Sequence, residues 1–337
     1  MKTILVTGGA GFIGSNFIPY FLLQHNDVRI VNLDALTYAG TEENLKELVG
    51  HPRYEFVKGD ICDRDLVDQL FGKHRLSGVI HFAAESHVDN SITGPEAFIK
   101  ANIVGTFTLL DAARRNWLKA PFVFHEGKEG ARFLHISTDE VYGSLGPEGY
   151  FTEKTPYAPN SPYSASKASS DMLVRSYFHT YGMNVVTTNC SNNYGPKQNK
   201  EKLIPTIIRK ALAEQPIPVY GDGKNVRDWL YVLDHCKGVD LVFFGGRSGE
   251  TYTIGGRNEK TNNQIVDTIC SILDEQKPRQ KGKSYKELIT YVTDRAGHDK
   301  RYAIDATKIE QELKWKPDED FKGGILKTID WYLNKSF

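Results

Sequence analysis

Cysteine is scarce in this 337-residue sequence, and charge of one sign is not in excess. Its four cysteines are widely separated, which argues against a disulfide scaffold or a zinc site and fits a reducing compartment. They are Cys62, Cys190, Cys236 and Cys270. Lys plus Arg and Asp plus Glu both number 42, so no global field would attract nucleic acid or an anionic membrane. We therefore expect small-molecule partners.

Long hydrophobic runs are also missing. No apolar stretch reaches membrane-spanning length, and the short one after Met1 and Lys2 leads straight into glycines, which leaves no room for a signal peptide. No histidine pair shows metal-ligand spacing with a carboxylate on one helical face, so we expect no metal site. These absences predict a cytoplasmic globular protein, and its 40% of hydrophobic residues can fill a large core.

The first residues carry the pattern of a β-α-β unit. Residues 3–7 predict a buried strand, 8–11 a turn, 12–24 an apolar helix and 28–33 a second strand. This order is typical of the start of a nucleotide-binding fold.

Within this unit, Gly9, Gly11 and Gly14 have the spacing of the dinucleotide fingerprint. The first glycines permit a tight turn and close approach of a pyrophosphate, and Gly14 lets helix and strand pack. The helix N-terminus then faces the phosphates. Asp34 ends the second strand, where a carboxylate accepts hydrogen bonds from a ribose and repels a 2′-phosphate, so NAD is preferred over NADP. The alternative role for Asp34 is a helix or turn cap.

The alternation of strand and helix continues, which predicts an α/β fold with a doubly wound, mostly parallel sheet. Further elements are predicted as strands over 54–58, 78–82, 132–137 and 184–189 and as helices over 64–74 and 95–116. Ligands of such sheets lie beyond the strand carboxyl ends, which directs attention to residues 59–61, 82–87 and 137–140. Asp60 is expected to accept a hydrogen bond from the adenine amino group.

The second half of the chain is less regular. Residues 119–131, with Pro, Gly and several charges, are predicted to be a surface insertion. After residue 190, short strands mix with helices near 202–214, 262–274 and 321–334. We therefore predict a nucleotide-binding domain over 1–190 and a smaller α+β substrate domain over 191–337, with a segment near 226–250 returning to the first domain.

Tyr163 and Lys167 lie four positions apart, after Ser161 and Pro162, which are typical of a helix start. On a helix both side chains share one face, and a nearby ammonium favours the phenolate form of a tyrosine, whose reference pKa is about 10. The lysine could also hold a ribose hydroxyl. The same spacing occurs without a helix pattern at Tyr54/Lys58, Tyr150/Lys154 and Tyr220/Lys224. The glycine-rich loop upstream favours Tyr163/Lys167 over these chance pairs.

Asp139 and Glu140 are adjacent where the strand predicted over 132–137 ends. Both side chains could enter the crevice near Tyr163, one held protonated by its neighbour and the cofactor's apolar surface while the other ionises. Such a pair would supply a proton donor and an acceptor. The alternative, a solvated pair at a loop end, is favoured by residue type alone. Thr138 offers a hydroxyl to a substrate oxygen.

In the C-terminal half, Asn192, Arg227 and Arg295 lie in short segments that combine amides, arginines and turn formers. Arginine binds phosphate through bidentate charged hydrogen bonds, so each segment could hold a diphosphate. The alternative for both arginines is surface pairing with the aspartate next to them. His87 and His298 are equally compatible with a pocket role and with an ordinary structural role.

Residues 7–14 and the Tyr163/Lys167 pair resemble the extended short-chain dehydrogenase/reductase superfamily. Within it, the dTDP-glucose 4,6-dehydratase family resembles this sequence over residues 83–89, 137–143, 191–196, 227–231 and 294–305. The Thr-Asp-Glu triplet at 138–140 is the specific feature, because related sugar epimerases usually lack the acidic pair. The alternatives are a nucleotide-sugar 4-epimerase, a UDP-glucose 4,6-dehydratase and a non-catalytic NAD-binding sensor.

The resemblance implies a mechanism for a lyase that acts on a nucleotide sugar with NAD. Tyr163 takes the proton of the sugar C4 hydroxyl while the C4 hydride passes to NAD. Lys167 lowers the tyrosine pKa, and Thr138 binds the same oxygen. Glu140 then removes the C5 proton, Asp139 protonates the departing C6 hydroxyl, and the hydride returns to C6. The product is a 4-keto-6-deoxy sugar nucleotide.

The resemblance also assigns binding residues and an assembly. The cofactor residues are Gly8, Gly11, Phe12, Ile13, Gly14, Asp34, Asp60, Ile61, Ala84, Ser86, Tyr163, Lys167 and Asn193. The substrate residues are His87, Thr138, Asn192, Lys202, Leu203, Pro218, Tyr220, Arg227, Asn262, Arg295 and His298. A homodimer is implied, paired through the helices of 95–116 and 163–181. Ala101 and Ala296 depart from the Thr and Pro that the family usually has there.

Overall fold

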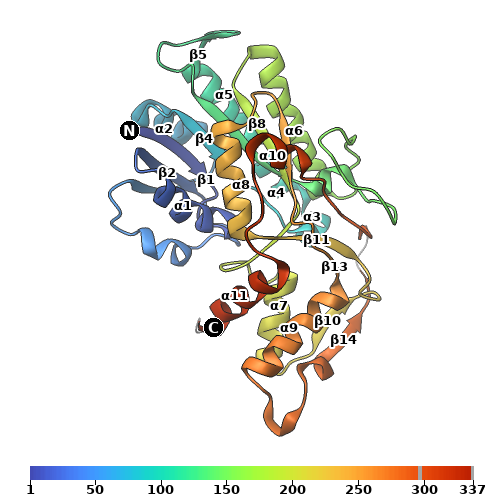
Figure 1. Cartoon of the computed structure of the whole chain (residues 1–337). Coiled ribbons are helices and arrows are strands. Elements are labelled where there is room, and N and C mark those ends of the chain that lie inside the picture. Colours follow the sequence, from blue (N-terminus) through green and yellow to red (C-terminus); the bar gives the residue numbers. More distant parts are fainter. Residues whose placement is uncertain (295–297, 335–337) are drawn as a thin grey trace.

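A seven-stranded sheet forms the larger part of the molecule in the computed structural model, which describes residues 1–294 and 298–334 (Figure 1). The strand order is β12-β8-β7-β4-β1-β2-β3, and every neighbouring pair is parallel. The strands are β1 (Lys2–Thr7), β2 (Val28–Asp34), β3 (Tyr54–Lys58), β4 (Gly78–His81), β7 (Arg132–Thr138), β8 (Val185–Cys190) and β12 (Thr251–Ile254). The predicted doubly wound α/β fold is confirmed.

Helices cover both faces of this sheet because successive residues of a strand point to opposite sides. Ile4 and Val6 of β1 join the core beneath α1 (Phe12–Gln24) and α8 (Val232–Gly245). Leu5 between them joins the core on the other face. That face is covered by α2 (Arg64–His74), α5 (Thr106–Trp117) and α6 (Pro162–Tyr181).

The helix predicted over 95–116 is interrupted. Its first turn, α4 (Pro95–Phe98), continues into a π-helical segment, Ile99–Gly105, before α5 begins. A Cβ added at Gly105 would lie 2.4 Å from Ile61 Cδ1, so this segment packs tightly on the loop after β3. Such π segments are frequent at functional sites, and no hydrophobic period reveals them.

Helix α6 begins at Pro162, as predicted. The Ser161 hydroxyl accepts from the Ser164 amide at 3.1 Å, and the Ser164 hydroxyl accepts from the Ser161 amide at 3.0 Å. This reciprocal capping box fixes the helix start. Tyr163 therefore lies in a well-defined first turn.

The residues after 190 form a smaller unit, drawn below the sheet in Figure 1. Its strands are β9 (Asn192–Tyr194), β10 (Ile217–Tyr220), β11 (Val226–Tyr231), β13 (Glu259–Thr261) and β14 (Ile289–Val292), and its helices are α7 (Leu203–Leu212), α9 (Asn262–Gln276) and α11 (Phe321–Asn334). Helix α8, strand β12 and α10 (Thr307–Leu313) instead pack with the large sheet. The division into domains at residue 190, with a returning segment, stays our proposal.

Short helical turns complete the chain. They are η1 (Glu42–Leu48), α3 (Val88–Thr93), η3 (Asp139–Tyr142), η4 (Gln280–Gly282) and η5 (Tyr285–Leu288). Among the helices of the described residues, none combines the length and apolarity needed to cross a bilayer.

The segment predicted as an insertion forms a small hairpin at the surface, β5 (Leu118–Ala120) with β6 (Val123–Phe124). Phe122 at its turn has a φ of +64°, and its amide donates to the Tyr181 carbonyl at 2.7 Å. A Cβ added at Gly182 would lie 2.3 Å from the Phe122 ring. The hairpin thus also packs on the end of α6.

Candidate active site

A cavity of about 440 Å³ lies at the carboxyl ends of the parallel strands, where such sheets bind ligands. Every predicted cofactor residue lines it: Gly8, Gly11, Phe12, Ile13, Gly14, Asp34, Asp60, Ile61, Ala84, Ser86, Tyr163, Lys167 and Asn193. The predicted catalytic residues Thr138, Asp139 and Glu140 line the same cavity. One continuous space therefore joins the glycine-rich loop to the Tyr163 helix.

The glycine-rich loop has no room for side chains. Gly8 has a φ of +73°, and a Cβ there would lie 2.5 Å from the Ala83 amide nitrogen. A Cβ at Gly14 would lie 2.5 Å from the Gly8 carbonyl oxygen. Gly11 caps α1 without a side-chain bond to its first amides, and the first turn holds no acidic residue. These open amides at a helix N-terminus fit a pyrophosphate.

Asp34 accepts two backbone hydrogen bonds, from Ala10 at 2.8 Å and from Leu36 at 2.8 Å. Both proposed roles therefore fit: its carboxylate fixes the turn after β2, and each oxygen keeps a second lone pair for a ribose hydroxyl. Burial raises the pKa of Asp34, while these amides lower it. Asp60 lines the cavity too and likewise accepts from an amide, that of Cys62, at 2.8 Å.

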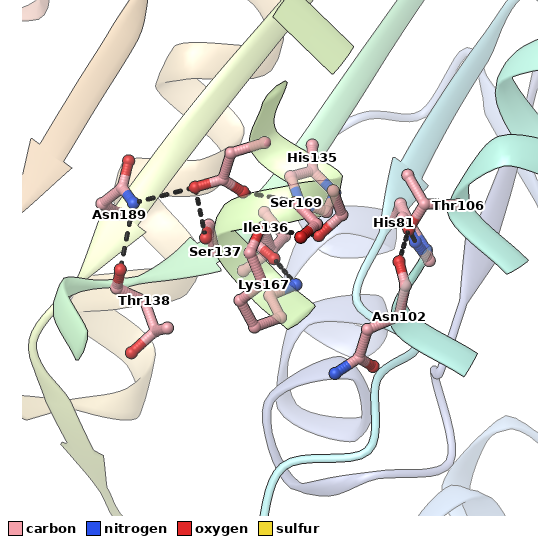
Figure 2. A network of polar contacts seen from close by, with 12 residues as sticks. His81, Asn102, Thr106, His135, Ile136, Ser137, Thr138, Lys167, Ser169 and Asn189 are labelled. Carbon is pink, nitrogen blue, oxygen red and sulfur yellow. Dashed lines mark hydrogen bonds and ion pairs between the residues drawn. The ribbon is translucent and has the colours of Figure 1, made fainter. Parts of the chain in front are cut away.

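Tyr163 and Lys167 are both buried, on the face of α6 that closes the cavity. The Lys167 ammonium donates to the Ile136 carbonyl at 2.8 Å (Figure 2). Burial lowers the pKa of Lys167 to about 8, and the Asp171 carboxylate opposes that shift. The Tyr163 phenol and an ammonium of lowered pKa, that of Lys167, therefore line the same side of the cavity.

The direction of the Tyr163 pKa differs from the expectation. Burial, with a further contribution from the Glu140 carboxylate, raises the pKa of Tyr163 well above 10, although the Thr138 hydroxyl partly opposes the shift. Spacing alone could not show this, because it gives neither the depth of the phenol nor the nearness of Glu140. Without bound ligand, Tyr163 is therefore a neutral phenol at pH 7.

Asp139 is 2% exposed, so the expectation of a solvated pair at a loop end is wrong. Burial raises the pKa of Asp139 well above its usual range, and the Glu140 and Asp228 carboxylates add to the shift. Its Oδ2 has no hydrogen-bond partner among the described residues, while its Oδ1 accepts from the Thr138 hydroxyl at 3.3 Å. These surroundings therefore favour the protonated form of Asp139, which is the form that the paired-acid hypothesis requires of one partner.

Thr138 organises this end of β7. It is the N-cap of η3, and its hydroxyl accepts from the Glu140 amide at 3.3 Å. The turn brings Asp139 and Glu140 to the cavity one after the other, which a continuing strand could not do because its side chains alternate. The other Tyr/Lys pairs lack such a setting: Tyr54/Lys58 lies in β3, and Tyr150/Lys154 and Tyr220/Lys224 lie outside helices.

The predicted substrate residues fall into two groups. Thr138, Asn192 and Lys202 line the cavity, and the Lys202 ammonium donates to the Ser86 carbonyl at 3.0 Å. The remaining described ones do not line it: His87, Leu203, Pro218, Tyr220, Arg227, Asn262 and His298. Arg295 and Ala296 lie outside the described residues.

Several of the second group have local partners. Arg227 is buried rather than paired at the surface, and its guanidinium donates to the Asp299 carbonyl at 2.8 Å and lies 4.3 Å from the Tyr302 ring centre. His87 accepts from the Asn90 amide at 3.4 Å at the start of α3. The surface-pair alternative for Arg227 is therefore wrong.

His298 and Tyr220 come from segments far apart in the sequence but lie together. Their ring centres are 6.5 Å apart, and His298 Nδ1 lies 2.6 Å from an Asp294 carboxylate oxygen. Both residues belong to the smaller unit, at the end of β10 and after β14. Their roles as substrate residues stay predictions.

Sequence reasoning missed other residues that line the cavity, among them Tyr38, Glu85, Lys100, Gln198, Asn199 and Glu201. Glu85 lies in the 82–87 segment that the sequence already indicated, Lys100 lies in the π-helical segment, and the other four lie in loops without a contiguous motif. Only the fold brings them together at the site. Ala101, in the π-helical segment, also lines it. The described residues contain no group of three or more His, Cys, Asp or Glu side chains that could hold a metal ion.

Comparison with known proteins agrees with this geometry. A family model described as GDP-mannose 4,6 dehydratase matches residues 5–328. A dTDP-glucose 4,6-dehydratase of Xanthomonas campestris pv. campestris (strain B100) is 57% identical over 333 residues, which cover 99% of this chain and 93% of the relative. One of Escherichia coli is 55% identical over 339 residues, with 98% and 92% covered. The chain belongs to the dTDP-glucose 4,6-dehydratase family.

Solved structures support the same family. A dTDP-glucose 4,6-dehydratase of Bacillus anthracis str. Ames in complex with NAD has a TM-score of 0.86 at 46% identity, with 99% of this chain and 97% of that chain covered. One of Streptomyces venezuelae with NAD and dTDP bound has a TM-score of 0.88 at 44% identity, with 98% and 97% covered. The family predicted from the motifs is confirmed.

The fold is also shared with epimerases. A UDP-glucose 4-epimerase of Thermotoga maritima, solved with UDP-glucose, has a TM-score of 0.85 at 27% identity, with 98% of this chain and 99% of that chain covered. Fold therefore does not separate the two activities. The much higher identity to dehydratases, together with the buried Asp139 beside Glu140, separates them.

Proposed function

We propose that the chain converts dTDP-glucose to dTDP-4-keto-6-deoxyglucose, with NAD as a cofactor that is regenerated within each turnover. The observation that carries this proposal is the cavity that holds Asp139, Glu140 and Tyr163 together, where burial and the neighbouring carboxylates raise the pKa of Asp139. An epimerase needs the tyrosine and has no use for a buried acid pair. Relatives 53–57% identical carry the dehydratase name.

The residues present fit NAD. The glycine-rich loop and the open end of α1 would hold the pyrophosphate, and Asp34 would hold the adenosine ribose. When bound, the nicotinamide supplies the chemistry that side chains lack, because it accepts the C4 hydride of the sugar and later returns it to C6. Lys167, which lines the same cavity, would hold a ribose hydroxyl of the cofactor.

The side chains have separate proton-transfer roles in the proposal. Tyr163 accepts the proton of the C4 hydroxyl, and Thr138 binds the same oxygen. Glu140 removes the C5 proton, which the 4-keto group makes acidic. Asp139 donates its proton to the departing C6 hydroxyl, so that water leaves with the C6 oxygen and the Asp139 proton while the C5 proton stays on Glu140.

Tyr163 cannot act as a base while its surroundings keep it neutral. Its pKa is raised by burial and by Glu140, so removal of the C4 proton has to be coupled to the arrival of positive charge or to proton transfer along a hydroxyl chain. The Lys167 ammonium is the nearby cation of this chain that could serve, if it leaves the Ile136 carbonyl. Ligand binding is thus part of how the base becomes active.

Substrate deuterated at C4 tests the proposed reaction. A dehydratase moves the label to C6, incorporates solvent hydrogen at C5 and releases a product lighter by one water. An epimerase would return the label to C4 with the C6 oxygen retained. Parallel incubations with dTDP-glucose and UDP-glucose, read by mass spectrometry, test the base: we expect faster loss of water from dTDP-glucose, and faster loss from UDP-glucose would contradict that choice.

We also propose a cytoplasmic homodimer paired through the helices around α5 and α6. Large apolar side chains are exposed on these neighbouring elements: Ile92, Ile99, Val104, Phe107 and Met172. An interface across these elements would cover these side chains. Sedimentation at micromolar concentration is expected to give twice the chain mass, and Val104→Glu is expected to weaken the assembly. A monomeric wild-type chain would contradict the proposal.

A further inference from the structure

A buried carboxylate lies behind the cavity wall, one helical turn beyond Lys167. Tyr163, Lys167 and Asp171 follow one another at intervals of four residues on α6, so they share one face of the helix. Tyr163 and Lys167 line the cavity, whereas Asp171 is 4% exposed and does not line it. The proposed mechanism gives Asp171 no role.

Asp171 collects hydrogen bonds from three other segments. One oxygen accepts from the Ser137 hydroxyl at 2.8 Å, from the Tyr157 hydroxyl at 3.0 Å and from the Asn189 amide at 3.4 Å. The other oxygen lies 3.0 Å from His135 Nε2. Burial lowers the pKa of His135 to about 4, so the neutral ring donates through this nitrogen.

These bonds fasten the end of β7 residue by residue. Asp171 holds the side chains of His135 and Ser137, and the Lys167 ammonium holds the carbonyl of the residue between them. Asn189, itself bonded to Asp171, donates to the Thr138 carbonyl at 3.0 Å. Figure 2 shows Ser137, Thr138, Asn189 and Lys167 gathered in this network. Asp139, the proposed acid, directly follows Thr138 in the chain.

We infer that Asp171 is a positioning residue that holds the 138–140 triplet in register with Tyr163 and keeps Lys167 in its charged, correctly placed state. The inference rests on the proposed roles of these residues. Asp171 touches neither the cavity nor the reacting atoms. It acts through Ser137 and Asn189 on the strand, and through its charge on the lysine.

The charge effect follows from what surrounds Lys167. Burial lowers the pKa of the lysine to about 8, and the Asp171 carboxylate is the group that opposes this shift most strongly. The other titratable groups packed around the network come from five other segments, and burial keeps each of them neutral at pH 7: His81, His135, Tyr142, Tyr157 and Cys190. Removing the Asp171 charge therefore leaves the lysine without its main opposing anion.

Asp171→Asn is the test, because it keeps the shape of the side chain and removes the charge. We expect kcat for water loss from dTDP-glucose to fall by ~10-fold with little change in KM. We also expect the alkaline limb of the pH profile, the fall of kcat at high pH, to move to lower pH by ~0.5–1 unit, because Lys167 loses its proton more easily. A purely structural role would lower stability without moving this limb.

Matched variants separate the two effects of Asp171, its placement of the 138–140 triplet and its charge effect on Lys167. Ser137→Ala and Tyr157→Phe each remove one donor and keep the carboxylate, so they are expected to leave the limb in place. Asp234→Asn removes another buried carboxylate, on α8, which accepts from the Asp318 amide at 2.7 Å. It is expected to lower the melting temperature without moving the limb. An equal limb shift in Asp234→Asn would overturn the inference.

A second measurement needs no enzymatic turnover, so it tests the inference even if the proposed function is wrong. The reactivity of the Lys167 amine toward acetic anhydride, measured by mass spectrometry across pH, reports its protonation directly. We expect its midpoint at lower pH in Asp171→Asn than in the wild type, and an unchanged midpoint would overturn the inference whatever the substrate. If Asp171→Asn does not fold, Asn189→Ala remains: its kcat is expected to fall with KM unchanged, and an unchanged kcat would overturn the positioning role.

Discussion

The two sides of the carboxyl end of β7 hold buried aspartates in opposite surroundings. On the cavity side, Asp139 is 2% exposed, and one of its oxygens has no hydrogen-bond partner among the described residues. On the interior side, Asp171 is 4% exposed, and its two oxygens are bonded to four side chains. Burial is similar, but Asp139 accepts one hydrogen bond, from Thr138 at 3.3 Å, whereas Asp171 is bonded to four side chains.

The difference indicates how one strand end serves two purposes. A buried carboxyl without donors favours its neutral form, so it can release a proton to a ligand. A carboxylate surrounded by donors is a fixed anion that orders whatever donates to it. The cavity side therefore carries reactive groups, and the interior side holds them in place. Variants on the two sides should consequently fail in different ways.

The largest effect on activity is expected for Glu140→Gln, on the cavity side. This variant loses the proposed base for the C5 proton, so water loss is expected to fall by ~10³-fold. Oxidation at C4 does not need that base, so absorbance at 340 nm from the reduced cofactor should still develop after substrate is added. Stopped-flow absorbance and product mass spectrometry measure the two steps separately.

The interior side supplies the contrast for that experiment. Asp171→Asn is expected to slow oxidation and water loss together, because it disturbs the whole triplet. If Glu140→Gln slowed both steps equally, its assignment as the C5 base would be wrong. If Asp171→Asn impaired water loss alone, the division between the two sides would fail.

An intermediate effect is expected for Thr138→Val, which lies on the boundary between the two sides. Its hydroxyl donates to Asp139 at 3.3 Å and accepts from the Glu140 amide at 3.3 Å, and in the proposal it also binds the sugar oxygen. Valine keeps the shape and removes these bonds, so kcat should fall by ~10–100-fold. Thr138→Ser retains the hydroxyl and should stay within a few-fold of the wild type. Equal losses in both variants would point to packing rather than hydrogen bonding.

The sequence predicted best those features whose parts are adjacent in the chain. The loop from Gly8 to Gly14 and Asp34 form a contiguous β-α-β unit, so spacing alone indicated their geometry. Strand β12 is different: its four residues pair with β8 from more than sixty positions away, and nothing in Thr251–Ile254 indicates that partner. The π-helical segment was also hidden, because it shifts a helix without changing composition.

At the site, the sequence predicted which groups are present better than how they behave. It identified Tyr163 and Lys167 as a pair, but the sign of the Tyr163 pKa shift depends on burial and on Glu140, neither of which spacing reveals. It also could not indicate Asp171, because that role depends on donors from three separate segments. Residue types at fixed spacing predict candidates, whereas depth and partners determine their chemistry.

The smallest expected effect, a change in stability with pH, separates the two aspartates most directly. The pKa of Asp139 is raised in the folded chain, so its contribution to stability is fully present below the unfolded pKa of about 4 and is lost as pH rises through the folded value. Asparagine does not ionise, so the variant does not lose stability as pH rises. Asp139→Asn should therefore raise Tm at pH 7 by about 1–2 °C, ~1 kcal/mol for a chain of this length, and the gain should shrink toward pH 4.

Asp171→Asn is the matched opposite, because its carboxylate is fully bonded and asparagine replaces an acceptor by a donor. Its Tm at pH 7 should fall, measured by calorimetry in the same buffers and with the same cofactor concentration as Asp139→Asn. If Asp139→Asn lost as much stability at pH 7 as Asp171→Asn, Asp139 would be an ionised structural carboxylate. It could then not supply the proton for the departing hydroxyl, and the contrast between the two sides of β7 would have no chemical meaning.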